Sequence, residues 1–215
     1  MKPERLSDNI TVYHGDRREI VPTLGVLDSV VCDPPYGMSF LSTASEQTGR
    51  HDRIIGDDTD ELLIWACNLK PRHSLYAFCR WDNLARVPKP TSCLTWVKNS
   101  WSMGDLEHEH ARMTEIALFY PGPEHSWPGK RPSDVMTANT TGNIHHPTEK
   151  PVSLMSHVVS FTSGTVLDPF MGSGTTGVAC AQNGRSFIGV ERDPKHYATA
   201  CRRISEALKQ ESLFT

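Results

Sequence analysis

The chain has 215 residues, of which 38% are hydrophobic and 22% are charged, and its formal net charge at pH 7 is −3. This length suits one domain with a substantial core, and the composition excludes collagen-like, coiled-coil and broadly disordered proteins. The slightly acidic balance, taken alone, argues against a general binder of polyanions such as nucleic acid.

The sequence also bears on the compartment of the protein. No apolar run reaches the roughly 18 to 20 residues that span a bilayer, and the polar N-terminus is unlike a secretory signal. The six cysteines are scattered without a CxxC pair, which favours reduced thiols over a disulfide framework. We therefore expect a cytoplasmic protein with no membrane partner.

Predicted strands and helices alternate along most of the chain. Apolar runs and helical periodicity predict, in order, a strand at 10–13, a short helix at 17–24, a strand at 26–32, a loop at 37–54, a helix at 62–69, strands at 75–79, 93–97 and 116–120, a helix at 152–161, a strand at 165–167, a helix at 176–182, a strand at 187–190 and a helix at 194–209. The alternation predicts an α/β fold with a doubly wound, mostly parallel sheet in a single domain, residues 1–215. Residues 121–145, rich in proline and poor in aliphatic side chains, are predicted to be an irregular insert.

The glycine turn (residues 172–177, Gly-Ser-Gly-Thr-Thr-Gly) has the GxGxxG pattern between a predicted strand and a predicted helix. Its glycines let backbone N–H groups approach a ligand at the positive end of the helix. Glu191 follows at the spacing of about 20 residues typical of an acidic partner, where a carboxylate can accept hydrogen bonds from ribose hydroxyls. Dinucleotides and S-adenosylmethionine both fit such a turn, and the alternative is a turn whose glycines serve only packing.

Asp168 favours one of these two ligands. It stands shortly before the turn, at the tip of the strand predicted at 165–167. A carboxylate there repels the pyrophosphate of a dinucleotide and attracts the cationic sulfonium and ammonium of S-adenosylmethionine. The sequence therefore favours the methyl donor.

The tetrad (Asp33-Pro34-Pro35-Tyr36) follows an apolar strand, so we expect it at the carboxyl edge of the sheet, where open α/β folds bind ligands. Because the two prolines remove two N–H donors, the Pro34 carbonyl can point into the cleft beside the Asp33 carboxylate. Two adjacent acceptors suit the two hydrogens of a planar amino group, and Tyr36 offers a face on which a ring can stack. The alternative is a proline-rich turn with a capping aspartate and a core tyrosine.

The order of these motifs resembles that of the β-class DNA amino-methyltransferases, which methylate exocyclic nitrogens of DNA bases. In that order the tetrad precedes the cofactor motif, here Asp168-Pro169-Phe170-Met171-Gly172-Ser173-Gly174. His146-Pro147-Thr148-Glu149-Lys150-Pro151 resembles the motif ahead of the cofactor strand, and Gly15-Asp16 resembles the acidic motif near the cofactor adenine. The resemblance implies a Rossmann-like, class I S-adenosylmethionine-dependent methyltransferase fold, with a short target-recognition insert at 121–145.

The resemblance also implies a role for each candidate site residue. The catalytic residues would be Asp33, Pro34, Pro35 and Tyr36. The S-adenosylmethionine site would be formed by Asp16, Asp33, His146, Thr148, Lys150, Asp168, Pro169, Phe170, Met171, Gly172, Ser173, Gly174, Thr175 and Glu191. No metal is expected, because the HxH pattern at 108–110 has no obvious further ligands to complete a site.

The expected reaction is methyl transfer to the N6 amino group of adenine in double-stranded DNA, with the base flipped out of the duplex. Aspartate at the first tetrad position is usual in adenine-N6 enzymes of the family, and serine is more typical of cytosine-N4 enzymes. The alternatives are transfer to cytosine N4, transfer to a planar amino or amide group of RNA or protein glutamine, and a non-enzymatic nucleotide-binding module.

DNA binding needs only a local basic face, so the net charge of −3 does not exclude it. The candidate phosphate contacts are Arg50, Arg53, Lys98, Lys130 and Arg131. Because the insert is small and β-class relatives commonly act as dimers, a homodimer is a further hypothesis.

Overall fold

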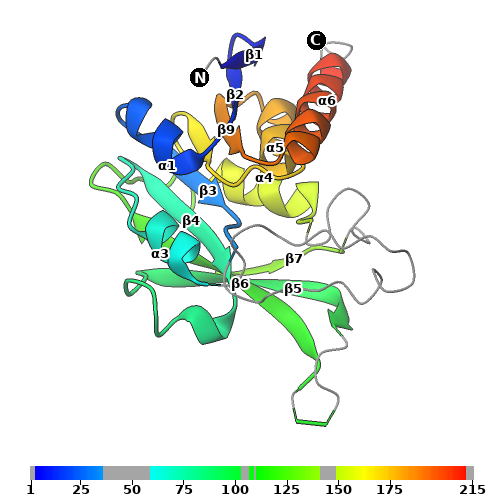
Figure 1. The fold of residues 1–215 in the computed structure, drawn as a ribbon. Coiled ribbons are helices and arrows are strands. Elements are labelled where there is room, and N and C mark those ends of the chain that lie inside the picture. Colours follow the sequence, from blue (N-terminus) through cyan, green and yellow to red (C-terminus); the bar gives the residue numbers. More distant parts are fainter. Residues whose placement is uncertain (1–2, 36–58, 103–106, 109, 141–148, 212–215) are drawn as a thin grey trace.

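Nine strands form one mixed sheet in the computed structural model, which describes residues 3–35, 59–102, 107–108, 110–140 and 149–211 (Figure 1). The strands are β1 (Glu4–Ser7), β2 (Ile10–His14), β3 (Ser29–Cys32), β4 (Ser74–Cys79), β5 (Ser92–Ser102), β6 (Arg112–Pro121), β7 (Val135–Thr137), β8 (Val166–Asp168) and β9 (Phe187–Glu191). The helices are α1 (Arg17–Ile20), α3 (Glu61–Cys67), α4 (Val152–Ser160), α5 (Thr175–Gln182) and α6 (Pro194–Glu211), with 3-10 turns η1 (Val21–Thr23) and η2 (Trp81–Asn83).

The strand order β1-β2-β9-β8-β3-β4-β6-β5-β7 contains a run of parallel strands from β2 to β4. Beyond β4, strand β6 pairs antiparallel with both of its neighbours, β4 and β5. Strand β7 then pairs parallel with β5. The direction of winding changes between β8 and β3, which is where doubly wound folds open a ligand crevice at the carboxyl ends of the strands. The mostly parallel, doubly wound sheet predicted from the sequence is therefore confirmed.

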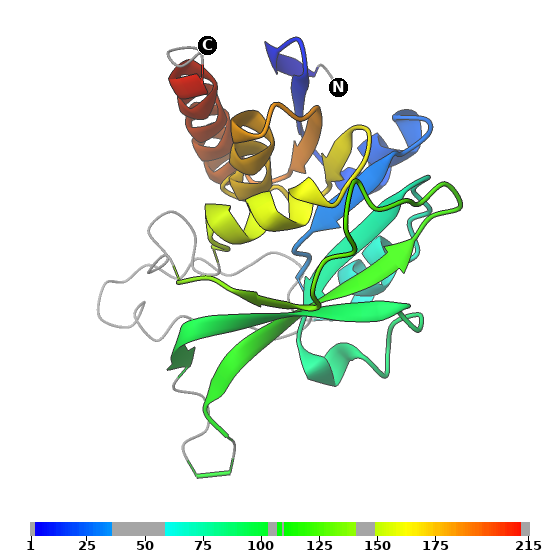
Figure 2. The same ribbon diagram turned by 180° about the vertical axis from the view of Figure 1, so that it is seen from behind.

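Helices cover both faces of the sheet because its central strands are apolar on both sides. Val30 and Val31 are adjacent in β3 and completely buried, and successive side chains of a strand point to opposite faces. Val30 belongs to a core with Leu63 of α3, whereas Val31 belongs to a core with Val158 of α4. Figure 2 shows the face that α4 and α5 cover, and Figure 1 shows α3 on the other face. These two layers hold the carboxyl ends of β3 and β8 in place.

The structure differs from the predicted elements at the first strands. The strand predicted at 26–32 begins only at Ser29, because the residues before it form a turn. In this turn Val26 is 73% exposed, and the Asp28 carboxylate accepts a hydrogen bond from the Thr165 amide. Strand β1, whose sequence shows no apolar alternation, joins the sheet edge by antiparallel pairing with β2 and has no counterpart among the predicted elements.

A further difference lies in the insert at 121–145, which is predicted to be irregular. It contains β7, which continues the sheet beyond β5. The loop predicted at 37–54 lies outside the described residues. Among the helices of the part that the structure describes, none is long and apolar enough to cross a membrane.

Candidate active site

The carboxyl ends of β3 and β8 bring residues 33–35 of the tetrad and the glycine turn to one edge of the sheet. Asp33 directly follows β3, and Asp168 is the last residue of β8. The two strands are neighbours in the sheet, with Val30 paired to Leu167. These residues lie far apart in the chain, and the structure places them at the same edge of the sheet.

The glycine turn adopts a backbone that requires glycine. Gly172 has a φ of +53°, and Gly174, the N-cap of α5, has a φ of +87°, in the left-handed region. A Cβ on Gly174 would lie 2.8 Å from the Cβ of Ala200, so α6 packs directly against the turn. A Cβ on Gly172 would meet nothing closer than the Phe170 carbonyl oxygen at 3.8 Å. Open space therefore lies beside Gly172, where a ligand can approach the backbone.

Glu191 ends β9 with its carboxylate turned toward the glycine turn. Its Oε2 accepts a hydrogen bond from the Gly172 amide at 2.8 Å, and its Oε1 accepts from the amides of Arg192 and Asp193 at 2.8 and 2.7 Å. These backbone donors orient the carboxylate, whose oxygens have further lone pairs for ligand hydroxyls. The ribose-binding role of Glu191 stays a prediction, and its position beside the turn is compatible with it.

Asp168 is buried and accepts hydrogen bonds from residues on both sides of the Gly172–Gly174 turn. Its Oδ1 accepts a hydrogen bond from the Phe170 amide at 2.9 Å, and its Oδ2 accepts from the Thr176 hydroxyl at 2.5 Å. Burial raises the pKa of Asp168 to about 7, although these two hydrogen bonds lower it in part. The carboxyl group is therefore poised to change its charge near neutral pH when a cation arrives nearby.

Arg203 of α6 fastens the glycine turn to the segment before α4. Its guanidinium donates to the carbonyl oxygen and to the hydroxyl of Ser173, both at 2.8 Å, and forms a 2.6 Å ion pair with Glu149. Thr175 lies in the same cluster, with its hydroxyl 3.5 Å from the Glu149 carboxylate. The sequence analysis assigns no role to Arg203 or Glu149. Glu149 lies inside the motif at 146–151, but nothing in the sequence indicates that Arg203 is its partner.

Arg17, the first residue of α1, contacts the cofactor motif, and Asp16 stands directly before it. Asp16 is the N-cap of α1. Arg17 donates from Nε to the Pro169 carbonyl oxygen at 3.1 Å, and its guanidinium lies 4.4 Å from the centre of the Phe170 ring. Phe170 and Met171 are both buried, one in each core. The predicted cofactor residues at 169–171 therefore contribute to packing, whatever else they contact.

The Asp33 carboxylate has two unlike oxygens. Its Oδ2 lies 2.6 Å from Nζ of Lys150, whose side chain is 5% exposed. Its Oδ1 is buried and has no hydrogen-bond partner within the part of the chain that the structure describes. Burial raises the pKa of Asp33 above its ordinary value, and the Lys150 ammonium opposes that rise. Because a buried unpaired acceptor is costly, Oδ1 is the atom for which a substrate donor would be most favourable.

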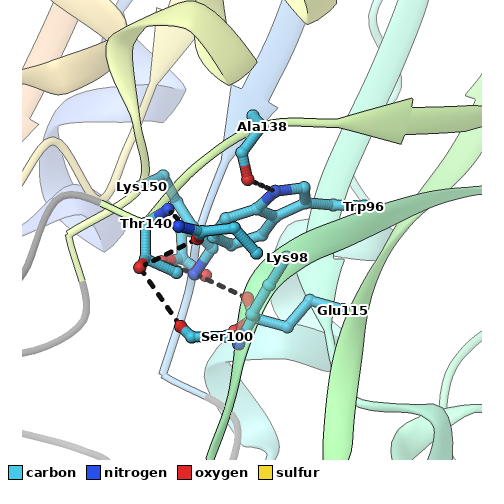
Figure 3. Close-up of polar contacts among 9 residues, drawn as sticks. Trp96, Lys98, Ser100, Glu115, Ala138, Thr140 and Lys150 are labelled. Atoms are coloured by element: carbon cyan, nitrogen blue, oxygen red, sulfur yellow. Dashed lines mark hydrogen bonds and ion pairs between the residues drawn. The ribbon is translucent and has the colours of Figure 1, made fainter.

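Lys150 also contacts a second carboxylate, which the sequence analysis does not single out. Its Nζ lies 3.2 Å from Oε2 of Glu115 in β6, and Oε1 of Glu115 is in turn paired with Lys98 of β5. Figure 3 shows the three side chains converging, next to Trp96, whose Nε1 donates to the Ala138 carbonyl oxygen at 2.9 Å. Lys98, a candidate phosphate contact, is therefore engaged in an ion pair and its side chain is only 16% exposed, and its contact with DNA stays a prediction.

Several predicted site residues lie outside the described residues. These are Tyr36, His146 and Thr148, together with the phosphate-contact candidates Arg50 and Arg53. Pro34 is buried and Pro35 is partly buried, both directly after Asp33. Within the described ranges, no group of three or more histidine, cysteine, aspartate or glutamate side chains is arranged to hold a metal ion.

The fold and this edge define a class: a doubly wound protein with Asp33 and a glycine turn at the point where the winding changes direction. A family model described as DNA methylase, covering N6 and N4 enzymes, matches residues 95–202. The type II methyltransferase M.HinfI of Haemophilus influenzae is 43% identical, over 96% of this chain and 71% of that protein. The putative methylase YubD of Escherichia coli K12 is 33% identical, over 89% of this chain and 88% of that protein.

A solved structure agrees with these relatives. The crystal structure of an M1.HpyAVI–SAM complex matches with a TM-score of 0.68 and 26% identity, over 90% of this chain and 99% of that chain. The chain belongs to the N6/N4 DNA methylase family. It is a DNA methyltransferase that uses S-adenosylmethionine, as the sequence analysis expects.

The residues present fit this cofactor. The open space beside Gly172 leaves its backbone accessible, and the carboxylate of Glu191 lies directly next to it. Asp168, buried under the turn, and Asp33, at the end of the adjacent strand, supply negative charge for a cationic sulfonium and ammonium.

Proposed function

We propose that this enzyme transfers the methyl group to the N6 amino group of adenine in double-stranded DNA. The observation that carries the proposal is Asp33, placed at the end of β3 with Oδ1 buried and unpaired among the described residues. An aspartate at this position, where cytosine-N4 enzymes of the family more often have serine, supports adenine as the target. S-adenosylmethionine supplies an electrophilic methyl group when it is bound.

Asp33 then has three tasks in the reaction. Its Oδ1 accepts a hydrogen bond from the amino group, which favours pyramidal geometry and concentrates the lone pair on the nitrogen that attacks the methyl carbon. As the nitrogen acquires the methyl group, the carboxylate stabilises the positive charge that develops on it. The same oxygen is placed to take the proton that the nitrogen must lose, and burial, which raises the pKa of Asp33, makes it a better proton acceptor.

The other site residues act by binding and orientation. Glu191 would bind the ribose, Asp16 would lie near the adenine of the cofactor, and residues 172–175 would line the donor pocket. Tyr36 would stack on the flipped base, with His146 and Thr148 in the neighbouring wall. Because no covalent enzyme intermediate is needed, positioning and electrostatics carry most of the rate enhancement.

The substrate base is identified directly by the product. The protein is incubated with labelled S-adenosylmethionine and unmethylated genomic DNA, and the digested nucleosides are resolved by mass spectrometry. N6-methyladenine is the expected product, and N4-methylcytosine would overturn the assignment.

The role of Asp33 is tested by Asp33→Ala. Loss of the acceptor and of the negative charge should lower methyl transfer by at least about 100-fold, the usual effect of removing a group that stabilises transition-state charge. Binding of S-adenosylmethionine, measured by calorimetry, should be largely retained, because the glycine turn and Glu191 stay intact. Normal turnover by this variant would contradict the proposed role.

We propose that the insert at 121–145 takes part in DNA recognition through the exposed basic residues Lys130 and Arg131. Because this insert is short, we further propose that a homodimer reads the target. Light scattering at the working concentration tests this directly, and a monomer there would remove the hypothesis.

A further inference from the structure

Four charged side chains of alternating sign form a row that ends at the proposed catalytic carboxylate. Lys98 of β5 pairs with Glu115 of β6, and Glu115 lies 3.2 Å from Lys150 (Figure 3). Lys150 lies 2.6 Å from Asp33. The outermost member, Lys98, has a side chain that is only 16% exposed, and Glu115 is 20% exposed. The row is therefore largely shielded from water, where charge–charge interactions are strong.

We propose that Glu115 is a positioning residue for Asp33: it shares the ammonium of Lys150, so that the Asp33 carboxylate is correctly aimed and its charge is not fully neutralised by that ammonium. This inference rests on the catalytic role proposed above for Asp33. Glu115 itself touches neither of the reacting atoms in this arrangement. It acts through Lys150.

The geometry gives Glu115 this role for two reasons. An ammonium committed to Asp33 alone would draw the carboxylate's charge toward Oδ2 and weaken Oδ1 as an acceptor. Because Nζ of Lys150 is held between two carboxylates, its position is set from both sides and its charge is divided between them. The second oxygen of Glu115 is held by Lys98, so this carboxylate cannot swing toward Asp33. Oδ1 of Asp33 is then left for the amino group of the base.

Rigid elements support the row. Glu115 is paired in register with Trp96, and both strands extend well beyond this point in the antiparallel β5–β6 pair. Strand β5 is fastened to the segment after β7 by the bond from Trp96 to Ala138 and by bonds from the Thr140 amide and hydroxyl to the Asn99 side chain at 2.9 and 3.3 Å. Side chains on strands held in this way are positioned more accurately than side chains on loops.

The charges around Asp33 come from several elements. The groups that interact with it are Lys150, Glu115, Lys98, Asp168 of β8, and the thiols of Cys32 and Cys79. Burial raises the pKa of Asp33, Lys150 lowers it, Glu115 raises it and Lys98 lowers it. Although burial acts to raise the pKa of Glu115 as well, the two ammonium groups hold it below its ordinary value, so Glu115 stays ionised.

The opposite signs of Glu115 and Lys98 give a test that a purely structural role would not pass. Glu115→Gln removes a negative charge near Asp33, so the acid limb of kcat/KM for DNA should move to lower pH. Lys98→Met removes a positive charge, so the same limb should move to higher pH. We expect Glu115→Gln to lower kcat by about 10- to 100-fold, as supporting partners of a functional group commonly do, with little change in KM for S-adenosylmethionine.

The matched control is Glu124→Gln. Glu124 is exposed and forms a 2.8 Å ion pair with Arg72. It lies just beyond Pro121, which pairs with Ser74 at the start of β4, so it is at the edge of the sheet opposite to Asp33. This variant should leave both kcat and the pH profile unchanged.

The assay counts total labelled methyl in DNA, so its outcome does not depend on which base is modified. Opposite shifts of the acid limb in the two variants support the inference. A wild-type kcat in Glu115→Gln, or limbs that stay in place or move together, overturn it. If Glu115→Gln does not fold, as judged by thermal unfolding, the direction of the shift in Lys98→Met decides alone. Asp33→Ala is measured in parallel. If Asp33→Ala turns over normally, the proposed role of Asp33 is wrong. If Asp33→Ala is inactive and Glu115→Gln is unaffected, only the proposed role of Glu115 is wrong.

Discussion

The ion pair between Arg203 and Glu149 gives the sharpest stability prediction, because Arg202, the preceding residue of the same helix, is a natural control. Arg203 and Glu149 have side chains that are 11% and 2% exposed and lie 2.6 Å apart. Arg202 pairs with Glu206 one turn further along α6, at 3.9 Å, with both side chains about 60% exposed. Arg203→Met and Arg202→Met therefore make the same chemical change in adjacent buried and exposed settings.

The expected costs differ several-fold. Removing one partner of a buried ion pair costs about 3–5 kcal/mol, and Arg203 also loses its two 2.8 Å bonds to Ser173. Because Glu149 keeps other contacts, including the Thr175 hydroxyl, we place Arg203→Met at the lower end, about 3 kcal/mol. An exposed pair spaced i,i+4 contributes about 0.3–0.5 kcal/mol, which is the expected cost of Arg202→Met.

Urea unfolding followed by tryptophan fluorescence measures both values. For a protein of this size, a loss of about 3 kcal/mol corresponds to a fall in Tm of about 6–12 °C. Calorimetry should also show weaker binding of S-adenosylmethionine by Arg203→Met, because the guanidinium holds Ser173 of the glycine turn. Free energies of unfolding that agree within about 0.5 kcal/mol for the two variants would refute the reasoning, since they would mean that Arg203 is solvated like Arg202.

Two other predictions concern the glycine turn and the aspartate beneath it. Gly174→Ala should cost about 2 kcal/mol or more in urea unfolding, because φ is +87° and the new methyl would lie 2.8 Å from Ala200. Gly172→Ala should cost only about 1 kcal/mol yet weaken S-adenosylmethionine binding, since its methyl fills open space beside the backbone; equal stability costs for the two variants would contradict this contrast. Burial raises the pKa of Asp168 to about 7, above its unfolded value of about 3.9. Between these two pH values the folded state binds more protons than the unfolded state. The free energy of unfolding therefore falls as pH rises through this range, by at most about 1.4 kcal/mol per pH unit. Asp168→Asn should lack this contribution, and parallel pH profiles of unfolding for the two proteins would count against it.

The fold class and the positions of Asp33, Asp168 and the glycine turn can be predicted from the sequence alone. Alternating strands and helices specify a doubly wound sheet, and the residues directly after two apolar strands must lie at its carboxyl edge. Asp33, Asp168 and the glycine turn are therefore predictable, because each stands next to a recognisable strand. The relation between Glu191 and Gly172 is predictable for the same reason, since it depends only on consecutive strand, turn and helix.

The pairing of side chains near that edge depends on tertiary packing and could not be predicted from the sequence. Lys98 has the charge that a phosphate contact needs, yet its ammonium is paired with Glu115 because β5 and β6 are adjacent. Lys150 reaches Asp33 across 117 positions of the chain, and Arg203 reaches Glu149 from the last helix. No local pattern encodes such pairs, because the partners are selected by the packing of separate elements. The sign of a side chain's charge is known from the sequence, whereas its ion-pair partner, and hence its role, depends on the fold.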